Sequence, residues 1–525
     1  MKYNLLNRTS DEFSDYPLLV NYVLTNLNIN RQQLNELLDV SIKPFPETVF
    51  LNLFKILYEA SKLKQKVMIC GDYDCDGICS ATIMRMLLNK LKIESGYYLP
   101  HRFNDGYGTS SKIISAAYKK GYRIVLMIDN GVSNFEAIAL ANELGMRVII
   151  IDHHQISESL NVDCLIHPDL LYRHFYSMCA SGLVYTLAYS LGMADDYMLV
   201  LAMIGTIGDV MPVLGQNRAI IVQGLSVMNK YHFTTIEQLT KQVVKRWSKD
   251  EIAFKIVPCF NCVSRLCDDI DVNSMVKYLM YDSKLDLYSY AKKIIELNQK
   301  RKEMSSNHYQ LALNYVNDSS IFIAHNEEFH PGIIGIVAGK IASTFNVLAF
   351  VLAKRNDEWV GSCRSSGNID IYNILLGTKE YLAHYGGHKS ACGFSLSNNN
   401  LLKWKQLLIA NTNILDIEEE GINALDVDPS CFSINSFNAL VQLEPFGVGF
   451  ELLPFCVLVN IEKIINFKNG GAKCLISPIN DLVEIVVFNQ SLAERIKIGH
   501  NYSVIGYLSL TYNHKNLSLI VDDII

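Results

Sequence analysis

Three aspartates lie within five residues of one another in the segment GDYDCDG, residues 71–77. The apolar run Lys66–Cys70 precedes this segment and the helical pattern Ile78–Leu91 follows it, which predicts a strand, a tight turn and a helix. Carboxylates crowded in this way resist joint ionisation unless cations lie among them. Asp72 and Asp74 could therefore bind a shared metal ion, although an Asp-rich turn that only caps a helix would have the same sequence.

Three further polar motifs follow predicted elements of the same region. They are Asp129-Asn130-Gly131 after the strand Arg123–Ile128, Asp152-His153-His154 after the strand Arg147–Ile151, and Gly205–Asp209 after a helical stretch. Open α/β sheets bind ligands at the carboxyl ends of their strands, so we expect these side chains to meet at one edge. Each motif alone has a structural explanation, but four of them at one edge indicate a site.

The side chains in these motifs suggest a particular chemistry. Carboxylates with imidazoles and without a thiolate suit Mn²⁺ or Mg²⁺ better than a structural zinc. Two such ions can activate water, stabilise a leaving oxygen and neutralise developing charge. The residues therefore predict a hydrolase that acts on a phosphoester or phosphoanhydride, without choosing among substrates.

The elements that must position these residues alternate between strand and helix over residues 46–215. Near-continuous apolar strands separated by amphipathic helices indicate a parallel, doubly wound sheet. Residues 216–318 are mainly helical and close in a long charged helix from about residue 285 to residue 315. The fold class expected for this half of the chain is α/β with a helical connector.

The second half of the chain is expected to contain a smaller α/β domain and a β-rich domain. A smaller α/β domain is expected over residues 319–415, followed by an acidic, turn-prone linker over about residues 415–435. Five short β-rich runs within residues 430–525 indicate a small barrel that resembles an OB-fold. Residues 1–45 are polar with some helical periodicity and are expected to form an N-terminal arm.

The composition is ordinary for a globular protein, with 50% hydrophobic and 19% charged residues among 525. A net charge of −6 argues against a protein that coats nucleic acid by bulk charge, but bound cations could still attract phosphate locally. No signal peptide or membrane-spanning run is expected. Thirteen scattered cysteines predict reduced thiols in a cytoplasmic protein. Cys259 and Cys262 lack a second pair for zinc and are expected in a packed turn.

With these motifs in order, the chain resembles the RecJ exonucleases of the DHH phosphoesterase superfamily. The similar segments, besides GDYDCDG and Asp152-His153-His154, are Gly106-Tyr107-Gly108, Gly205–Pro212, Gly215–Arg218, Asn261–Leu266, His330–Ala338, Gly361–Ser365, Gly386–His388 and Leu443–Gly449. The resemblance covers nearly the whole chain after residue 45. It implies a DHH catalytic domain, a DHHA1-like substrate-binding domain and a nucleic-acid-binding barrel.

The resemblance also implies an activity, namely single-stranded-DNA-specific 5′→3′ hydrolysis that releases 5′-mononucleotides in DNA repair and recombination. Two ions, Mn²⁺ or Mg²⁺, would be held with Asp129 bridging both of them. Asp74, His153 and Asp209 would complete one metal site, and Asp72 would hold the other ion. His154 would lie near the scissile phosphate.

Other positions match family residues that contact the substrate. These are Arg102, Tyr107, Arg265, Ser362, Arg364 and His388. The arginines and Ser362 would contact the strand or its 5′ phosphate, His388 would approach from the second domain, and Tyr107 would stack on a terminal base. The implied partners are single-stranded DNA, a single-strand-binding protein and a helicase, for a monomer that does not contact membranes.

The residues are also compatible with two alternative functions. A small-molecule DHH phosphoesterase, such as a pyrophosphatase, a nanoRNase or a cyclic-dinucleotide phosphodiesterase, often has a histidine where this chain has Met68. A thioether is a poor ligand for Mn²⁺ or Mg²⁺. A non-catalytic replication scaffold would have lost metal ligands, and this chain retains all of them.

Overall fold

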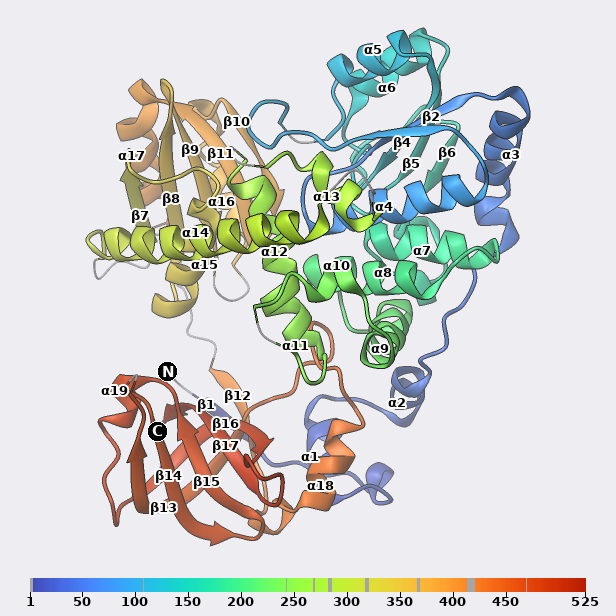
Figure 1. Cartoon of the computed structure of the whole chain (residues 1–525). Helices are drawn as coiled ribbons and strands as arrows, with labels where there is room; N and C mark the ends of the chain where they lie inside the picture. The colour runs from blue at the N-terminus through green and yellow to red at the C-terminus, as the bar shows by residue number, and fades with distance from the viewer. Residues whose placement is uncertain are drawn as a thin grey trace.

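The computed structural model describes residues 3–106, 108–241, 243–267, 270–281, 286–316, 321–365, 369–412, 421–468 and 470–525, and only the backbone of residue 388. Two α/β domains lie side by side and are linked by a helical connector, with a β-barrel domain below them (Figure 1). Both termini lie at the barrel. No helix in the described ranges is long and apolar enough to span a membrane.

The first α/β domain is built on a five-stranded parallel sheet in the order β3-β2-β4-β5-β6. Its strands are β2 (Lys66–Cys70), β3 (Ser95–Tyr98), β4 (Tyr122–Ile128), β5 (Arg147–Ile151) and β6 (Cys164–Ile166). Its helices are α3 (Glu47–Leu63), α4 (Cys75–Lys90), α5 (Ser111–Lys119), α6 (Phe135–Glu143), α7 (Ala180–Ser190), α8 (Asp196–Gly208) and α9 (Gly215–Lys230). Leu126 packs into one hydrophobic core and its neighbour Met127 into another, so helices cover both faces. The expected doubly wound sheet is confirmed.

The connector consists of α10 (Thr234–Glu237), α11 (Lys249–Glu251), a π-helical turn (Ile252–Ile256), α12 (Val257–Arg265), α13 (Asn273–Leu279) and α14 (Leu287–Leu313). The long helix expected here is confirmed by α14, which runs along the second α/β domain (Figure 1). Cys259 and Cys262 are buried in α12, so the expectation of a turn is wrong. Pro258 explains this, because proline is tolerated in the first turn of a helix.

The second α/β domain contains a five-stranded mixed sheet in the order β10-β11-β9-β8-β7. Its strands are β7 (Ile321–Asn326), β8 (Leu348–Arg355), β9 (Glu358–Arg364), β10 (His384–His388) and β11 (Ala391–Ser397), and its helices are α15 (Ile334–Phe345), α16 (Ile371–Leu376) and α17 (Leu401–Thr412). Only the β7–β8 pair is parallel among the strand pairs of this sheet, as far as the described residues show. Phe350 and Trp404 pack at its core.

The barrel domain closes on itself through an additional pairing between its first strand and its fourth. Its strands are β13 (Phe455–Asn466), β14 (Ala472–Ile479), β15 (Leu482–Val487), β16 (Asn501–Leu510) and β17 (Leu517–Ile524), with α18 (Ile434–Val441) before them and α19 (Gln490–Ala493) between β15 and β16. The order β13-β14-β15-β17-β16 returns to β13, with β15 and β17 parallel. This closed five-stranded barrel confirms the expected OB-like fold.

The first residues of the chain belong to this same domain. β1 (Tyr3–Leu6) pairs in parallel with β12 (Ile422–Asp426), which in turn pairs with β13. The helices α1 (Leu18–Asn26) and α2 (Arg31–Leu38) place Leu24 and Leu34 in the same core as Phe432 and Phe455. The acidic linker expected over residues 415–435 is therefore wrong for residues 422–426, because Ala424 and Leu425 are buried in a strand.

Arg218, in α9, connects the first α/β domain to the barrel domain. Its buried guanidinium donates hydrogen bonds to the carbonyl oxygens of Leu37, Leu443, Glu444 and Pro445, at 2.6–3.1 Å. It also lies 5.4 Å from the centre of the Phe450 ring. Arg218 thus joins α9 to residue 37 and to residues 443–450, which are distant from it in sequence.

Replacing Arg218 with methionine keeps an unbranched side chain at this position but removes all of the guanidinium donors. We expect Arg218→Met to lower the free energy of unfolding by about 3 kcal/mol, because buried carbonyl oxygens lose their partners. Urea denaturation followed by circular dichroism would measure this. Arg173→Met changes an exposed arginine and should have little effect. Equal stability of the two variants would contradict the role given to Arg218.

Candidate active site

Acidic and histidine side chains from four segments meet at one edge of the first sheet. Three overlapping groups of ligand atoms lie within 4.8 Å of one another and could hold metal ions. They are Asp72, Asp74 and Asp129; Asp129, His153 and His154; and Asp76, His153 and Asp209. The structure thus brings together the six residues that the sequence singled out as catalytic or metal-binding, and adds Asp76 to them.

His153 lies between two of the carboxylates. Its Nε2 is 3.2 Å from Asp129 Oδ1 and 3.4 Å from Asp209 Oδ2. Burial and the neighbouring charge of His154 lower the pKa of His153 to about 4. A neutral imidazole of this kind has a lone pair available for a metal ion.

Asp152 organises the loop that carries both histidines. Its Oδ1 accepts hydrogen bonds from the backbone N–H groups of His153 and His154, at 2.7 and 3.2 Å, and lies 2.8 Å from His154 Nδ1. Its Oδ2 accepts from the N–H of Val132 at 3.1 Å. Burial opposes ionisation of Asp152, but the bonds from His154 prevail and lower its pKa to about 2. Burial likewise opposes charge on His154, but Asp152 raises its pKa to about 9.

Asp76 and Asn130 fix the backbone on either side of the cluster, and the sequence alone did not assign them these contacts. Asp76 accepts hydrogen bonds from the N–H groups of Ala180 and Ser181, at 2.8 and 2.9 Å, at the start of α7. Asn130 donates to the carbonyls of Cys70 and Ile128, which ties the ends of β2 and β4 together. The neighbouring Asp129 has a φ of +62°, a left-handed conformation that aspartate adopts more readily than most residues.

The remaining carboxylates lie in an environment that disfavours their joint ionisation. Burial and then the neighbouring aspartates raise the pKa values of Asp72, Asp129 and Asp209 well above the usual range, and that of Asp74 is also raised. Asp72 Oδ1 and Asp209 Oδ2 are buried without a hydrogen-bond donor among the described residues. Oxygen atoms of this kind, next to a neutral imidazole, fit divalent cations that prefer hard ligands.

Three arginines converge opposite this cluster. They are Arg102 in the loop after β3, Arg265 at the end of α12 and Arg364 at the end of β9. Burial, followed by the charges of Arg102 and Arg364, lowers the pKa of Arg265 to about 9. Arg102 lies 5.1 Å from the centre of the Tyr73 ring, between Asp72 and Asp74 in the sequence. The positive cluster therefore borders the negative one.

Ser362 joins the arginine cluster through the second domain. Its Oγ accepts a hydrogen bond from Arg364 at 2.9 Å. A Cβ on Gly335, near the start of α15, would lie 3.1 Å from Ser362 Oγ, so this part of the helix faces the cluster. Of the other expected substrate contacts, Tyr107 and the side chain of His388 lie outside the described residues.

Two family models match the chain in the regions that contain these clusters. The DHH family, N-terminal domain, matches residues 66–206, and the DHHA1 domain matches residues 317–411. The chain thus contains a DHH domain followed by a DHHA1 domain, and it is similar to the RecJ exonucleases. The carboxylate cluster lies in or next to the DHH match, and Ser362 and Arg364 lie in the DHHA1 match.

Similar proteins support this assignment over most of the chain. The single-stranded-DNA-specific exonuclease RecJ of Bacillus subtilis is 28% identical over 489 residues, which cover 89% of this chain and 62% of that protein. The RecJ of Haemophilus influenzae is 24% identical, and the match covers 91% of this chain and 90% of the relative. The chain thus spans less than two thirds of the first relative's length.

Solved structures show the same fold. The crystal structure of RecJ in complex with Mn²⁺ from Thermus thermophilus superposes with a TM-score of 0.85 at 20% identity, covering 100% of this chain and 80% of that one. A structure of exonuclease RecJ bound to manganese gives a TM-score of 0.62 at 25% identity, covering 71% of this chain and 96% of that one.

Metal binding tests the carboxylate cluster of this chain directly. We expect Asp129→Asn to weaken Mn²⁺ binding by at least about tenfold, because Asp129 belongs to two of the three ligand groups. Affinity for Mn²⁺ should rise with pH, because raised pKa values mean that protons compete with the metal. Isothermal titration calorimetry would measure both effects. Asp357→Asn, at an exposed position, should bind Mn²⁺ normally. Unchanged affinity in Asp129→Asn would exclude a metal site here.

Gly77 tests the packing that positions Asp72. A Cβ at this position would overlap the backbone of Asp72, whose Cα would lie only 2.7 Å away. We expect Gly77→Ala to displace Asp72 and to weaken Mn²⁺ binding by about tenfold, as calorimetry would show. The matched control is Gly339→Ala in α15, where a Cβ meets no atom within 4 Å. Normal binding by Gly77→Ala would show that the turn adapts without moving Asp72.

Proposed function

We propose that this chain is a metal-dependent, single-stranded-DNA-specific 5′→3′ exodeoxyribonuclease that releases 5′-mononucleotides in DNA repair and recombination. The observation that carries the proposal is the juxtaposition of a buried carboxylate cluster on the DHH domain with an arginine cluster shared with the DHHA1 domain. The first suits divalent cations and the second suits phosphate. The names of the relatives add the substrate class, single-stranded DNA. The 5′→3′ direction belongs to the proposal and would follow from binding of the 5′ end by the arginine cluster.

The donor set fits two divalent ions, Mn²⁺ or Mg²⁺. Asp129 would contribute to both positions, with Asp74, His153 and Asp209 completing one of them and Asp72 holding the other. When bound, such ions lower the pKa of water and neutralise charge that develops on phosphate oxygens. The solved RecJ structures that resemble this chain were obtained with Mn²⁺ and with Mg²⁺.

The side chains around the ions would bind and orient the scissile phosphate. Asp152 holds the His154 ring through the 2.8 Å contact to Nδ1, which leaves the opposite side of the ring to donate a hydrogen bond to a phosphate oxygen. Asp76 and Asn130 hold the backbone, so the acidic groups need not rearrange during the reaction. This pre-organisation is the part of catalysis that the protein itself supplies.

The arginine cluster would bind the 5′ end of the strand. Arg102, Arg265 and Arg364 offer planar donors to phosphate, and Ser362 Oγ lies among them. Their position beside the carboxylates would place a terminal phosphate at a fixed distance from the site of cleavage and so impose the 5′→3′ direction. Tyr107 and His388 remain predicted contacts to the terminal base and the phosphate.

A contact between the two α/β domains would limit the width of the substrate. The Phe103 ring lies 6.0 Å from the ring of His330, and the Arg355 guanidinium bonds the carbonyl of Phe103 and lies 5.5 Å from its ring. We infer that this bridge, at the residue after Arg102 in the sequence, would close one side of the space between the domains. A closed side would favour a single strand over a duplex.

The cellular setting is also a proposal. A cytoplasmic monomer that acts with a single-strand-binding protein and a helicase fits free cysteine thiols and single-stranded substrate. Single-stranded DNA itself would be held further along by the barrel domain, since OB-like barrels bind single strands.

Digestion of end-labelled single-stranded DNA tests the proposed activity. We expect release of mononucleotides from the 5′ end with Mn²⁺ or Mg²⁺, none with a chelator, and a loss of at least about 1000-fold in Asp129→Ala. Asp357→Ala should retain full activity, because Asp357 is exposed and belongs to none of the ligand groups.

Three results would contradict the proposal. Attack from 3′ ends would exclude the role of the arginine cluster, and equal digestion of duplex would exclude the single-strand limit. Hydrolysis of pyrophosphate or dinucleotides without any DNA cleavage would instead identify a small-molecule phosphoesterase.

A further inference from the structure

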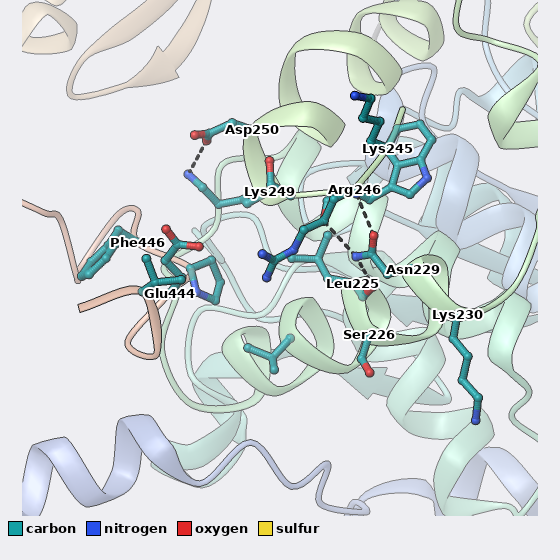
Figure 2. A pocket seen from close by; sticks show the side chains of 15 residues that line it. Leu225, Ser226, Asn229, Lys230, Lys245, Arg246, Lys249, Asp250, Glu444 and Phe446 are labelled. Carbon is teal, nitrogen blue, oxygen red and sulfur yellow. Dashed lines mark hydrogen bonds and ion pairs between the residues drawn. The ribbon is translucent and has the colours of Figure 1, made fainter. Parts of the chain in front are cut away.

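A large cavity lies between the core of the chain and the barrel domain, away from the carboxylate and arginine clusters. Its volume is about 980 Å³. One wall is formed by α9 and residues 245–250, and the other by residues 441–446 (Figure 2). None of its described lining residues belongs to either cluster. Ligand pockets in proteins fall at or below this size, often where domains meet.

Four cationic residues line this cavity, and two of them, Arg246 and Lys249, lie on the side of Glu444. Figure 2 shows Arg246 extending toward Glu444, with Lys249 on the same side, whereas Lys230 and Lys245 extend away from Arg246. Arg246 makes no hydrogen bond or close ion pair with the other described residues, but it interacts with Glu444: burial raises the pKa of Glu444 and the charge of Arg246 lowers it. Lys249 lies 3.6 Å from Asp250, whose side chain is 72% exposed, and exposed ion pairs of this kind are weak. Both cations can therefore bind an anion, in competition with the carboxylates of Glu444 and Asp250.

The opposite wall offers an aromatic ring and an acceptor. Phe446 is half-buried and stacks on Phe450, with ring centres 5.0 Å apart, so its position is fixed. Val441 extends the apolar surface of this wall, and Leu225 of α9 adds apolar surface from the other side. Glu444 lies between the ring and Arg246 and can accept hydrogen bonds from hydroxyl or amino groups (Figure 2).

Both walls are held in place before any ligand binds. Asn229 accepts a hydrogen bond from the N–H of Trp247 at 2.8 Å and donates one to its carbonyl at 2.9 Å, which anchors the backbone next to Arg246. Trp247 is itself buried. On the other side, Arg218 binds the carbonyls of Glu444 and Pro445. A pre-organised pocket loses little entropy on binding.

We propose that this cavity binds a free mononucleotide. Arg246 and Lys249 would contact its phosphate, Phe446 would lie against its base, and Glu444 would accept hydrogen bonds from the ribose or the base. An inorganic anion would contact Arg246 and Lys249 but would make no favourable contact with Phe446 or Glu444. The bound nucleotide would touch the core and the barrel domain together and so stabilise their relative position, a property separate from the proposed nuclease activity.

Calorimetric titration with 5′-AMP tests this site. The titrated protein is the full chain carrying Asp129→Asn, in the presence of a chelator, so that binding at the carboxylate cluster does not contribute. We expect saturable binding that Arg246→Gln weakens by at least about tenfold. Phe446→Leu should weaken 5′-AMP binding but not binding of inorganic phosphate. The matched control, Arg123→Gln, changes an exposed arginine on the first sheet and should bind normally.

Three outcomes would overturn the proposal. Absence of 5′-AMP binding at millimolar concentration would show that the cavity holds no nucleotide. Equal affinity in Arg246→Gln would place any binding elsewhere. Binding of a single-stranded oligonucleotide through Arg246, without binding of 5′-AMP, would make the cavity a contact for the DNA strand.

Discussion

Buried carboxylates that cannot all ionise without cations are the constraint on which this structure depends. Asp152, Asp76 and Asn130 each form hydrogen bonds with the backbone around the cluster, and Asp152 also contacts the His154 ring. Asp72 and Asp209 each retain a buried oxygen without a donor among the described residues. Such an arrangement is unfavourable in isolation, since buried unpaired oxygens and like charges both destabilise a fold. The parallel sheet tolerates it because its strand ends are fixed by their own ladders and by the Asn130 bridge.

Much of this cluster could be predicted from the sequence, because its acidic residues lie next to the ends of elements with a clear pattern. Asp72, Asp129 and His153 follow buried strands, and a parallel sheet brings strand ends together whatever the strand order. The backbone roles of Asp76 and Asn130 could not be read in this way, because they depend on which N–H or carbonyl group lies nearby. The sequence did contain one signal for Asp76. It is the third aspartate in GDYDCDG, and capping the helix that follows requires only one of them.

Contacts between segments distant in sequence could not be predicted either, because they also depend on which groups the fold brings together. The pairing of β1 with β12 joins two short strands more than 400 residues apart, and neither has a long periodic pattern. The contacts of Arg218 were equally difficult to predict. Its partners are backbone carbonyls of residues 37 and 443–445, and every residue has such a group, so the sequence does not mark them. Local periodicity specifies elements, whereas the closure of a domain by its chain ends depends on three-dimensional packing.

The opposition of the two charged clusters would allow an acidic chain to bind a polyanion, the substrate proposed for it. The net charge of −6 describes the whole surface, but a phosphate responds to charges within a few ångströms in a site shielded from water. Arg265 donates to the carbonyl of Gly332 at 3.3 Å, and a side chain at Gly332 would overlap the Arg265 backbone. Arg265 is therefore held by a close contact between the connector and the second domain. Because that contact leaves no room for a Cβ at Gly332, the fold itself sets the position of the Arg265 backbone against the second domain, without a bound strand.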